Sequence, residues 1–470
     1  MSIGSRSQRA AWTRRQWLQA GAFGAMSLST PQWLAALAHA APAAKARAKN
    51  VLLLIEHGGL SHIDTWDPKP EAPSEHRSPF KPIDTNVPGI QFTELLPKTA
   101  KIADRLAVVR GMYHKIRVDD HARGMQYVLS GEAPGGPVEM PDMGSVVSYL
   151  KGSDCKYLPP YIQLPATSEM ASFTKVGFLP PSYGVFKATA SNAADPKWRV
   201  PNLGLQQGVN QQRFNDRRGL LNKLDAEWDA VGNREAKSMS AFFEQADNLL
   251  LNPKTLSAFD LASESDEIKN RYGVGHRGFC YLLGRKLIEA QVRFVTIDVR
   301  WPRPPDAPGG GNLNWDHHDH IYATGTCELP GATGAGAGRY GIGHWMMTGS
   351  LDQAYSTLIQ DLEERGLLKE TLVCLATEFG RTPNINKAKG RDHWTHAYTM
   401  VFSGAGIRGG QVIGATDSSG GYVVENGYAP EDYAATVYDF LGIDRERPIF
   451  TPENRPIYLA KRGETIRELL

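Results

Sequence analysis

The chain has 470 residues, which is enough for one large α/β domain with insertions or for two to three smaller domains. Its formal net charge is only +2, and no concentrated basic stripe is present, so nucleic acid is excluded as a partner. The four cysteines are far apart and show no C-x-x-C spacing, so the sequence does not indicate a cysteine zinc site.

A twin-arginine signal peptide is predicted over residues 1–40. Arg14-Arg15 precede a weakly apolar stretch, residues 20–37, which is followed by Ala38-His39-Ala40. This order predicts export by the Tat machinery and a periplasmic or other extracytoplasmic location. The apolar stretch is too short for a membrane span and contains Pro31, and no later stretch is long and apolar enough to be one.

Short apolar runs alternate with helix-like segments after residue 41. The first run, residues 50–55, is continuous, as is typical of a strand buried on both faces of a parallel sheet. The alternation predicts an α/β fold with a mostly parallel central sheet and helices on both faces. The other predicted strands are residues 106–109, 294–297, 372–376 and 398–402, and the clearest helices are residues 277–290 and 349–365.

Two regions interrupt this alternation and are expected to be loop insertions of the single domain 41–470. Residues 178–251 begin with a Pro-, Asn-, Ser- and Gly-rich stretch and continue into two amphipathic helices near 212–231 and 237–251. Residues 302–343 contain two Gly/Pro-rich stretches that flank the densest histidine cluster. Long loops in α/β enzymes commonly cover a site, and plain insertion loops are the alternative.

Most histidines fall in four short clusters at or just after the predicted strands, whose carboxyl ends form one rim in a parallel sheet. The first cluster follows the first strand and offers Glu56 and Asp64 as metal-binding or acid–base groups, or as simple turn caps. The second contains His121 at the start of a helix, where free N–H groups favour an anionic ligand. The alternative for this segment is that Asp119 or Asp120 caps the helix and His121 is solvated.

The third cluster, Trp315-Asp316-His317-His318-Asp319-His320, is the most specific of the four. Carboxylate and neutral imidazole are ligands that zinc, manganese and iron accept, and either Asp316 with His318 or Asp316 with His320 is feasible in a loop. A solvated histidine-rich loop without metal is the alternative.

The fourth cluster follows the strand 372–376. Glu378 and His393 are candidate ligands there, and the forked guanidinium of Arg381 suits the paired oxygens of a phosphate or sulfate. A structural ion pair between Glu378 and Arg381 is the competing interpretation. Four such clusters on one rim predict a metal-centred anion site.

With these motifs in view, the chain from about residue 50 onward resembles the exported domain-of-unknown-function-1501 family, within the alkaline-phosphatase and sulfatase superfamily. The resemblance implies an alkaline-phosphatase-like three-layer sandwich. The matching motifs are Gly58-Gly59-Leu60-Ser61-His62-Ile63-Asp64-Thr65-Trp66-Asp67, Trp315-Asp316-His317-His318, Thr377-Glu378-Phe379-Gly380-Arg381-Thr382-Pro383 and Gly390-Arg391-Asp392-His393-Trp394.

The segments also depart from the sulfatase pattern. His121 stands where a sulfatase has its nucleophile, so a covalent nucleophile, a metal ligand and an inert residue are all open roles for it. Glu378 and Phe379 stand where the late sulfatase strand has aspartate and histidine, and Phe379 cannot bind metal. These differences disfavour a sulfatase proper.

We therefore expect an exported hydrolase in which one or two divalent ions, zinc, manganese, iron or calcium, act on a small anionic phosphate- or sulfate-type ester. The alternative is a non-catalytic exported binding or cell-surface protein that retains the fold. The predicted catalytic residues are His121 and Arg381. The predicted metal ligands are Glu56, Asp64, Asp316, His318, His320, Glu378 and His393.

Overall fold

The computed structural model describes residues 46–165, 173–188, 193–195, 198–200, 203, 210–229, 246–247, 249–250, 252–299, 314–322 and 341–470. The predicted signal peptide, residues 1–40, lies outside the described residues, as does most of the predicted insertion 302–343. In the part of the chain that is described, every helix is too short or too polar to cross a membrane.

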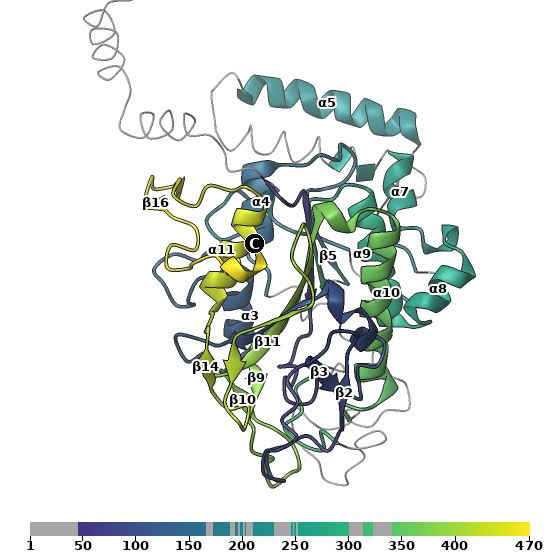
Figure 1. The fold of residues 1–470 in the computed structure, drawn as a ribbon. Coiled ribbons are helices and arrows are strands. Elements are labelled where there is room, and N and C mark those ends of the chain that lie inside the picture. Colours follow the sequence, from purple (N-terminus) through teal and green to yellow (C-terminus); the bar gives the residue numbers. More distant parts are fainter. Residues whose placement is uncertain are drawn as a thin grey trace, which may run out of the picture. The chain divides into compact units, whose positions relative to one another are not determined.

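An eight-stranded sheet lies at the centre of the fold (Figure 1). Its order is β12-β4-β11-β8-β1-β7-β5-β6, and all strands run parallel except β11, which is antiparallel to both neighbours. The predicted mostly parallel sheet is thus confirmed, whereas the reversal of β11 was not foreseen. The strands are β1 Asn50–Ile55, β4 Ala107–Met112, β5 Tyr161–Leu164, β6 Phe186–Lys187, β7 Phe294–Asp298, β8 Thr371–Ala376, β11 Tyr398–Gly404 and β12 Gln411–Ile413.

The central strand β1 is buried along its whole length because both faces of the sheet are covered. Successive side chains of a strand point to opposite faces, so Leu52 and Leu54 pack in one core cluster and Val51 and Leu53 in the other. This two-sided burial explains why the sequence of β1 is a continuous apolar run instead of an alternating one.

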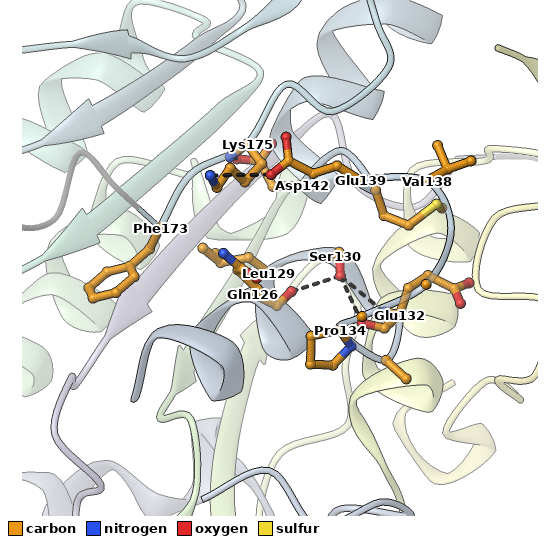
Figure 2. A pocket seen from close by; sticks show the side chains of 14 residues that line it. Gln126, Leu129, Ser130, Glu132, Pro134, Val138, Glu139, Asp142, Phe173 and Lys175 are labelled. Carbon is orange, nitrogen blue, oxygen red and sulfur yellow. Dashed lines mark hydrogen bonds and ion pairs between the residues drawn. The ribbon is translucent and has the colours of Figure 1, made fainter. Parts of the chain in front are cut away.

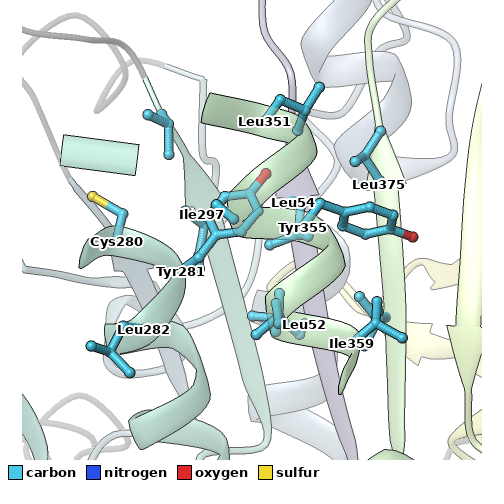
Figure 3. Packing of buried hydrophobic residues seen from close by; sticks show 14 of the residues in the cluster. Leu52, Leu54, Cys280, Tyr281, Leu282, Ile297, Leu351, Tyr355, Ile359 and Leu375 are labelled. Atoms are coloured by element: carbon cyan, nitrogen blue, oxygen red, sulfur yellow. The ribbon is translucent and has the colours of Figure 1, made fainter. Parts of the chain in front are cut away.

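Helices from different parts of the chain cover the two faces (Figure 1). Residues of α9 His276–Glu289 and α10 Ser350–Glu364 pack with Leu52 and Leu54, as Figure 3 shows. The opposite core cluster contains residues of α3 His121–Ser130, α4 Met143–Lys151 and α11 Pro430–Phe440. The predicted three-layer arrangement, with helices on both faces of the sheet, is therefore confirmed.

The remaining elements lie outside these three layers. The first predicted insertion helix is α5 Gln211–Asp229, while the second, near 237–251, falls largely outside the described residues. The short helices are α7 Pro253–Phe259, α8 Asp266–Tyr272, η1 Thr99–Arg105, η3 Pro181–Tyr183, η4 Leu261–Ser263, η5 Trp345–Gly349, η6 Leu368–Glu370 and η7 Arg467–Leu469. The two-stranded sheets pair β2 Pro82–Asp84 with β3 Gln91–Thr93, β9 Gly380–Arg381 with β10 His393–Trp394, β13 Ala415–Thr416 with β14 Val423–Glu425, and β15 Ile449–Phe450 with β16 Pro456–Ile457.

Candidate metal centre

Segments far apart in the sequence meet beyond the carboxyl ends of the parallel strands. Strands β1 and β8 are paired in register up to Ile55 and Ala376, so the polar segments that follow them leave the sheet together. His121 is the first residue of α3, and β10 pairs with β9 so that His393 lies opposite Arg381. The last contributor, residues 314–322, contains no helix or strand.

Three imidazoles surround one carboxylate oxygen at this rim. Oδ1 of Asp316 lies 3.2 Å from Nε2 of His121, 3.0 Å from Nε2 of His318 and 3.1 Å from Nε2 of His393. The Nε2 atoms of His318 and His393 are themselves 2.9 Å apart. We call these four residues the His-Asp cluster. The structure thus brings together residues from the second, third and fourth sequence clusters.

The opposite ring nitrogen of each of these histidines is held by an acceptor. Nδ1 of His121 lies 2.6 Å from Oε1 of Glu378, that of His318 2.9 Å from Oδ1 of Asp392, and that of His393 2.6 Å from the backbone oxygen of Asp119. Metal-binding histidines are anchored in this way, because an Nδ1–H that donates to an acceptor leaves the Nε2 lone pair for the ion. The anchored rings and Asp316 therefore fit a divalent metal.

The cluster is open to small solutes on its histidine side. The side chains of His121, His318 and His393 are 22%, 35% and 19% exposed, whereas the Asp316 side chain is 7% exposed. Structural zinc sites are closed, and catalytic sites keep a position accessible to water or substrate. The partial exposure of the imidazoles is the property expected of an accessible site.

The charges of the cluster are strongly coupled. Burial alone would lower the pKa of His121, but the hydrogen bonds to Asp316 and Glu378 outweigh it and raise this pKa to about 9. Burial likewise opposes ionisation of Asp316, yet the hydrogen bonds from His121, His318 and His393 hold its pKa far below the usual range. A metal ion would thus meet an ionised carboxylate and compete with a proton at His121.

Glu378 connects the turn after β1 with α3. Its buried Oε1 accepts a hydrogen bond from the Gly58 backbone N–H at 2.8 Å and lies 2.6 Å from His121 Nδ1 and 3.6 Å from His57 Nδ1. His57, His121 and Glu378 form a second group whose atoms are close enough to share an ion. Because Glu378 binds Nδ1 of His121, the nitrogen that faces away from Asp316, it is placed to orient His121 as a ligand.

Arg381 is enclosed in the protein instead of facing solvent. The guanidinium is 0% exposed and donates to the backbone oxygens of Gly58, Gly59 and Arg391 and to Oδ1 of Asp316 at 2.6 Å. These bonds join β9 to the turn after β1 and to Asp316. The sequence predicts that Arg381 faces a substrate anion, whereas in the structure Arg381 is buried and supports Asp316.

Two predicted ligands lie in ion pairs of their own. Both oxygens of Glu56 are 2.6 Å from Nη1 of Arg277. Oδ2 of Asp64 lies 3.1 Å from Nε of Arg391 and accepts from the Ser61 hydroxyl at 2.6 Å. The sequence alone does not distinguish a carboxylate that forms a buried ion pair from one that binds metal when both lie at strand ends or in turns. Glu56 and Asp64 were predicted as ligands for this reason. The structure brings neither into the His-Asp cluster.

His320, the alternative to His318, also stays outside the cluster. Its backbone has a φ of 44°, and its N–H donates to the oxygen of Ala388 at 3.1 Å. This left-handed residue turns the chain after His318, and the next residue, Ile321, is fully buried. Of the two pairs considered from sequence, the structure thus brings together Asp316 and His318.

Phe379 forms an apolar wall of the cluster. Its fully buried ring lies 5.1 Å from the His121 ring and 4.6 Å from the His393 ring, measured between centroids. On α3, a Cβ added at Gly124 would lie 3.2 Å from this ring, so the glycine lets the helix approach Phe379 closely. Phe379, which cannot bind metal, therefore packs against His121 and His393 and restricts the planes of their rings.

A pocket lies beside the carboxyl-terminal half of α3 and the segment that follows it (Figure 2). The ring of Phe173, at one end of the pocket, stacks on His57 with centroids 5.2 Å apart, and His57 lies 5.2 Å from His121. Phe173 is thus a lining residue that also contacts His57, whereas His57 and the cluster residues do not line the pocket. Its lining also includes Gln126, Leu129, Ser130, Glu132, Pro134, Glu139, Asp142 and Lys175.

The acceptors that bind the Nδ1 atoms of the three imidazoles were not predicted from the sequence. Asp392 precedes His393 in the motif quoted above, yet its partner is His318, and the Asp119 backbone oxygen carries no sequence signal. His57 was part of the first cluster without an assigned role. The adjacency of Asp392 to a histidine was the only available signal.

Fold and site together define an α/β protein with a histidine–carboxylate cluster at the carboxyl rim of its sheet. The chain belongs to the family described as Protein of unknown function (DUF1501), whose model matches residues 48–470. The predicted family membership is thereby confirmed. Among curated proteins, a search found no match.

Several solved structures are similar to the chain at low identity. An alkaline phosphatase superfamily protein from Vibrio parahaemolyticus is 11% identical, with a TM-score of 0.35, and the match covers 91% of this chain and 72% of that one. The phosphonate monoester hydrolase of Agrobacterium radiobacter is 11% identical, with a TM-score of 0.37 and coverages of 90% and 77%. A sulfatase from Pseudoalteromonas sp. is 13% identical, with a TM-score of 0.34 and coverages of 85% and 69%.

Proposed function

We propose that the His-Asp cluster binds a divalent transition metal and that the protein is an exported hydrolase of phosphate- or sulfate-type esters. The observation that carries the proposal is the convergence of three Nε2 atoms on Asp316, each ring being anchored at Nδ1. A nitrogen-rich donor set favours zinc, manganese or iron over calcium, which prefers oxygen ligands.

The bound ion would polarise the ester oxygens and lower the pKa of a water molecule. The residues of the chain hold and shape the site. Asp316, His121, His318 and His393 would hold the ion, Glu378 orients His121, and the Phe379 ring would exclude water from one side. The amino end of α3, which begins at His121, adds a positive dipole that favours an anionic substrate.

The ester class rests on the segment-by-segment resemblance to the sulfatase superfamily, in which His121 takes the nucleophile position. Because imidazole Nε2 of His121 faces Asp316 and Nδ1 faces Glu378, the residue is better placed as a ligand than as a nucleophile. We therefore propose that water attacks the phosphorus or sulfur directly, so that a new bond to the water oxygen forms as the bond to the alcohol oxygen breaks and the alcohol leaves with a proton from the water.

The test compares the mature protein with His393→Ala on p-nitrophenyl phosphate, bis-p-nitrophenyl phosphate and p-nitrophenyl sulfate, with zinc or manganese added. Metal-dependent turnover that is lost in a variant of unchanged circular dichroism would support the proposal. Turnover that is unchanged in His393→Ala would refute it.

A non-catalytic binding protein is the second candidate, favoured by the absence of a hydroxyl or thiol at position 121. A well-folded wild-type protein that contains no transition metal and hydrolyses none of the esters would establish it.

Export is tested separately. Replacement of Arg14 and Arg15 by lysine should retain the precursor in the cytoplasm, and equal export of both forms would exclude the Tat route.

A further inference from the structure

A buried ion pair lies at the carboxyl end of β1. Glu56 is fully buried, and Arg277, from the first turn of α9, is 2.6 Å from both of its oxygens. The Tyr281 hydroxyl donates to Oε1 at 2.7 Å, and Arg277 Nε donates to the Ser350 hydroxyl at 3.0 Å. Burial opposes the charge on Arg277, but Glu56 outweighs this effect, so the pKa of Arg277 is raised. The pair connects β1 with α9 and α10.

The side chain of Trp315 completes this network. Its indole Nε1–H donates to Oε2 of Glu56 at 2.6 Å, and the guanidinium of Arg277 lies over its ring, 5.5 Å from the centroid. The indole is 1% exposed, and the backbone N–H of Trp315 donates to the oxygen of His57 at 3.0 Å. The residue that follows Trp315 in the chain is the cluster carboxylate, Asp316.

Such an anchor is needed because residues 314–322 have no helix or strand to hold them. Backbone hydrogen bonds from His320 and Ile321 to Ala388 and Lys389 hold the later part of the segment, and Trp315 holds its beginning. The Asp316 carboxylate must nevertheless meet the imidazole of His318 from its own segment and those of His121 and His393 from two others, and small misplacements of a metal ligand weaken binding. The indole nitrogen of Trp315, the residue before Asp316, is bound to Glu56 at the end of β1.

We propose that Glu56 and Arg277 hold the Trp315 side chain in place and so position Asp316 for metal binding. The inference rests on the proposed metal-binding function of the His-Asp cluster. Glu56, Arg277 and Trp315 are positioning residues, since they act on the ion through Asp316. This role replaces the direct ligand role expected for Glu56 from the sequence.

The test is the affinity of the mature protein for Zn²⁺ and for Mn²⁺, measured by competition with a chelator at fixed pH. Trp315→Phe keeps an aromatic ring but removes the donor to Glu56. We expect the dissociation constant to rise by about 10- to 100-fold, the range typical of lost outer-shell partners. Unfolding of the metal-free protein by urea shows whether the variant remains folded.

Two matched variants separate positioning from stability. Tyr281→Phe removes a donor to the same carboxylate from α9 and leaves Trp315 in place, so the affinity should be unchanged. Trp66→Phe replaces another buried indole, whose N–H has no hydrogen-bond partner in the described part of the chain, and should also leave the affinity unchanged.

The outcomes are distinct. Wild-type affinity in Trp315→Phe overturns the inference while leaving the metal centre intact. Equal weakening in Tyr281→Phe also overturns it, because the network would then act only through general stability. A wild-type protein that binds neither ion refutes the proposed function and the inference together.

Discussion

His121 and Asp316 come from opposite halves of the chain, and His121 Nε2 lies 3.2 Å from Asp316 Oδ1. His121 begins a helix on one face of the sheet, and Asp316 lies in a segment without regular structure. Both residues are also connected to the turn after β1. Glu378 binds this turn and His121, and Arg381 binds this turn and Asp316. The metal centre is therefore also a junction of the fold.

Removal of either residue should abolish metal retention. We expect wild type to contain one equivalent of transition metal and His121→Ala and Asp316→Ala to lose it, because each substitution deletes a donor atom. Plasma mass spectrometry of protein purified without chelators measures this content. The exposed His396 lies outside the cluster, so His396→Ala should retain the metal. Equal metal content in all four proteins would contradict the assignment.

Glu378→Gln tests the support behind His121. The substitution removes the negative charge 2.6 Å from His121 Nδ1 while nearly keeping the side-chain volume. We expect metal affinity to fall by about 10- to 100-fold, as for other outer-shell carboxylates. Glu363→Gln is the control, since this carboxylate is half-exposed and pairs with Arg105 away from the rim. If both variants bind metal like wild type, Glu378 does not orient a ligand.

The close approach at Gly58 should make this position intolerant of a side chain. Gly58 has a φ of 108°, and an added Cβ would lie 2.6 Å from the backbone nitrogens of both Trp315 and Asp316. Gly89 has a φ of 83° with nothing within 4 Å of the added atom, so Gly89→Ala isolates backbone strain. We expect a loss of about 1–2 kcal/mol in unfolding free energy for Gly89→Ala and of more than about 3 kcal/mol for Gly58→Ala.

Urea unfolding of the two alanine variants gives both values. The comparison is informative because strain is common to them and only the contact with Trp315 and Asp316 differs. Similar losses would mean that the segment can move away from Gly58 without cost.

Buried His114 should make stability depend on pH. Burial lowers its pKa from 6.5 to about 4, and its Nε2–H donates to the backbone oxygen of Glu378 at 2.8 Å. Because the unfolded chain takes up the proton at higher pH than the folded one, this contribution is complete above about pH 6.5 and is lost as pH falls toward 4. At pH 5 the loss should be about 2 kcal/mol.

Urea unfolding at pH 7 and pH 5 measures this effect. His114→Gln keeps a donor for the Glu378 oxygen without titrating, so the difference between the two pH values should shrink by about that amount. An unchanged difference would show that other groups dominate the acid sensitivity.

The local pattern of the sequence determined the architecture. Mostly apolar runs identified β1, β4, β7, β8 and β11, because strands buried on both faces are rich in apolar residues. The polar residues just after these runs indicated where the carboxyl-terminal rim of the sheet lies. The antiparallel direction of β11 was not predicted, because an apolar run has the same composition whichever way the strand runs.

The choice among carboxylates and imidazoles was made only by tertiary structure. Glu56 and Glu378 both follow a central strand, yet Glu56 faces Arg277 and Trp315 while Glu378 faces His121. The sequence determined which residues reach the rim, because strand periodicity is local. Which of them meet was decided by the packing of helices and loops from distant parts of the chain, because hydrogen bonds and metal ligation depend on side-chain direction within about an ångström.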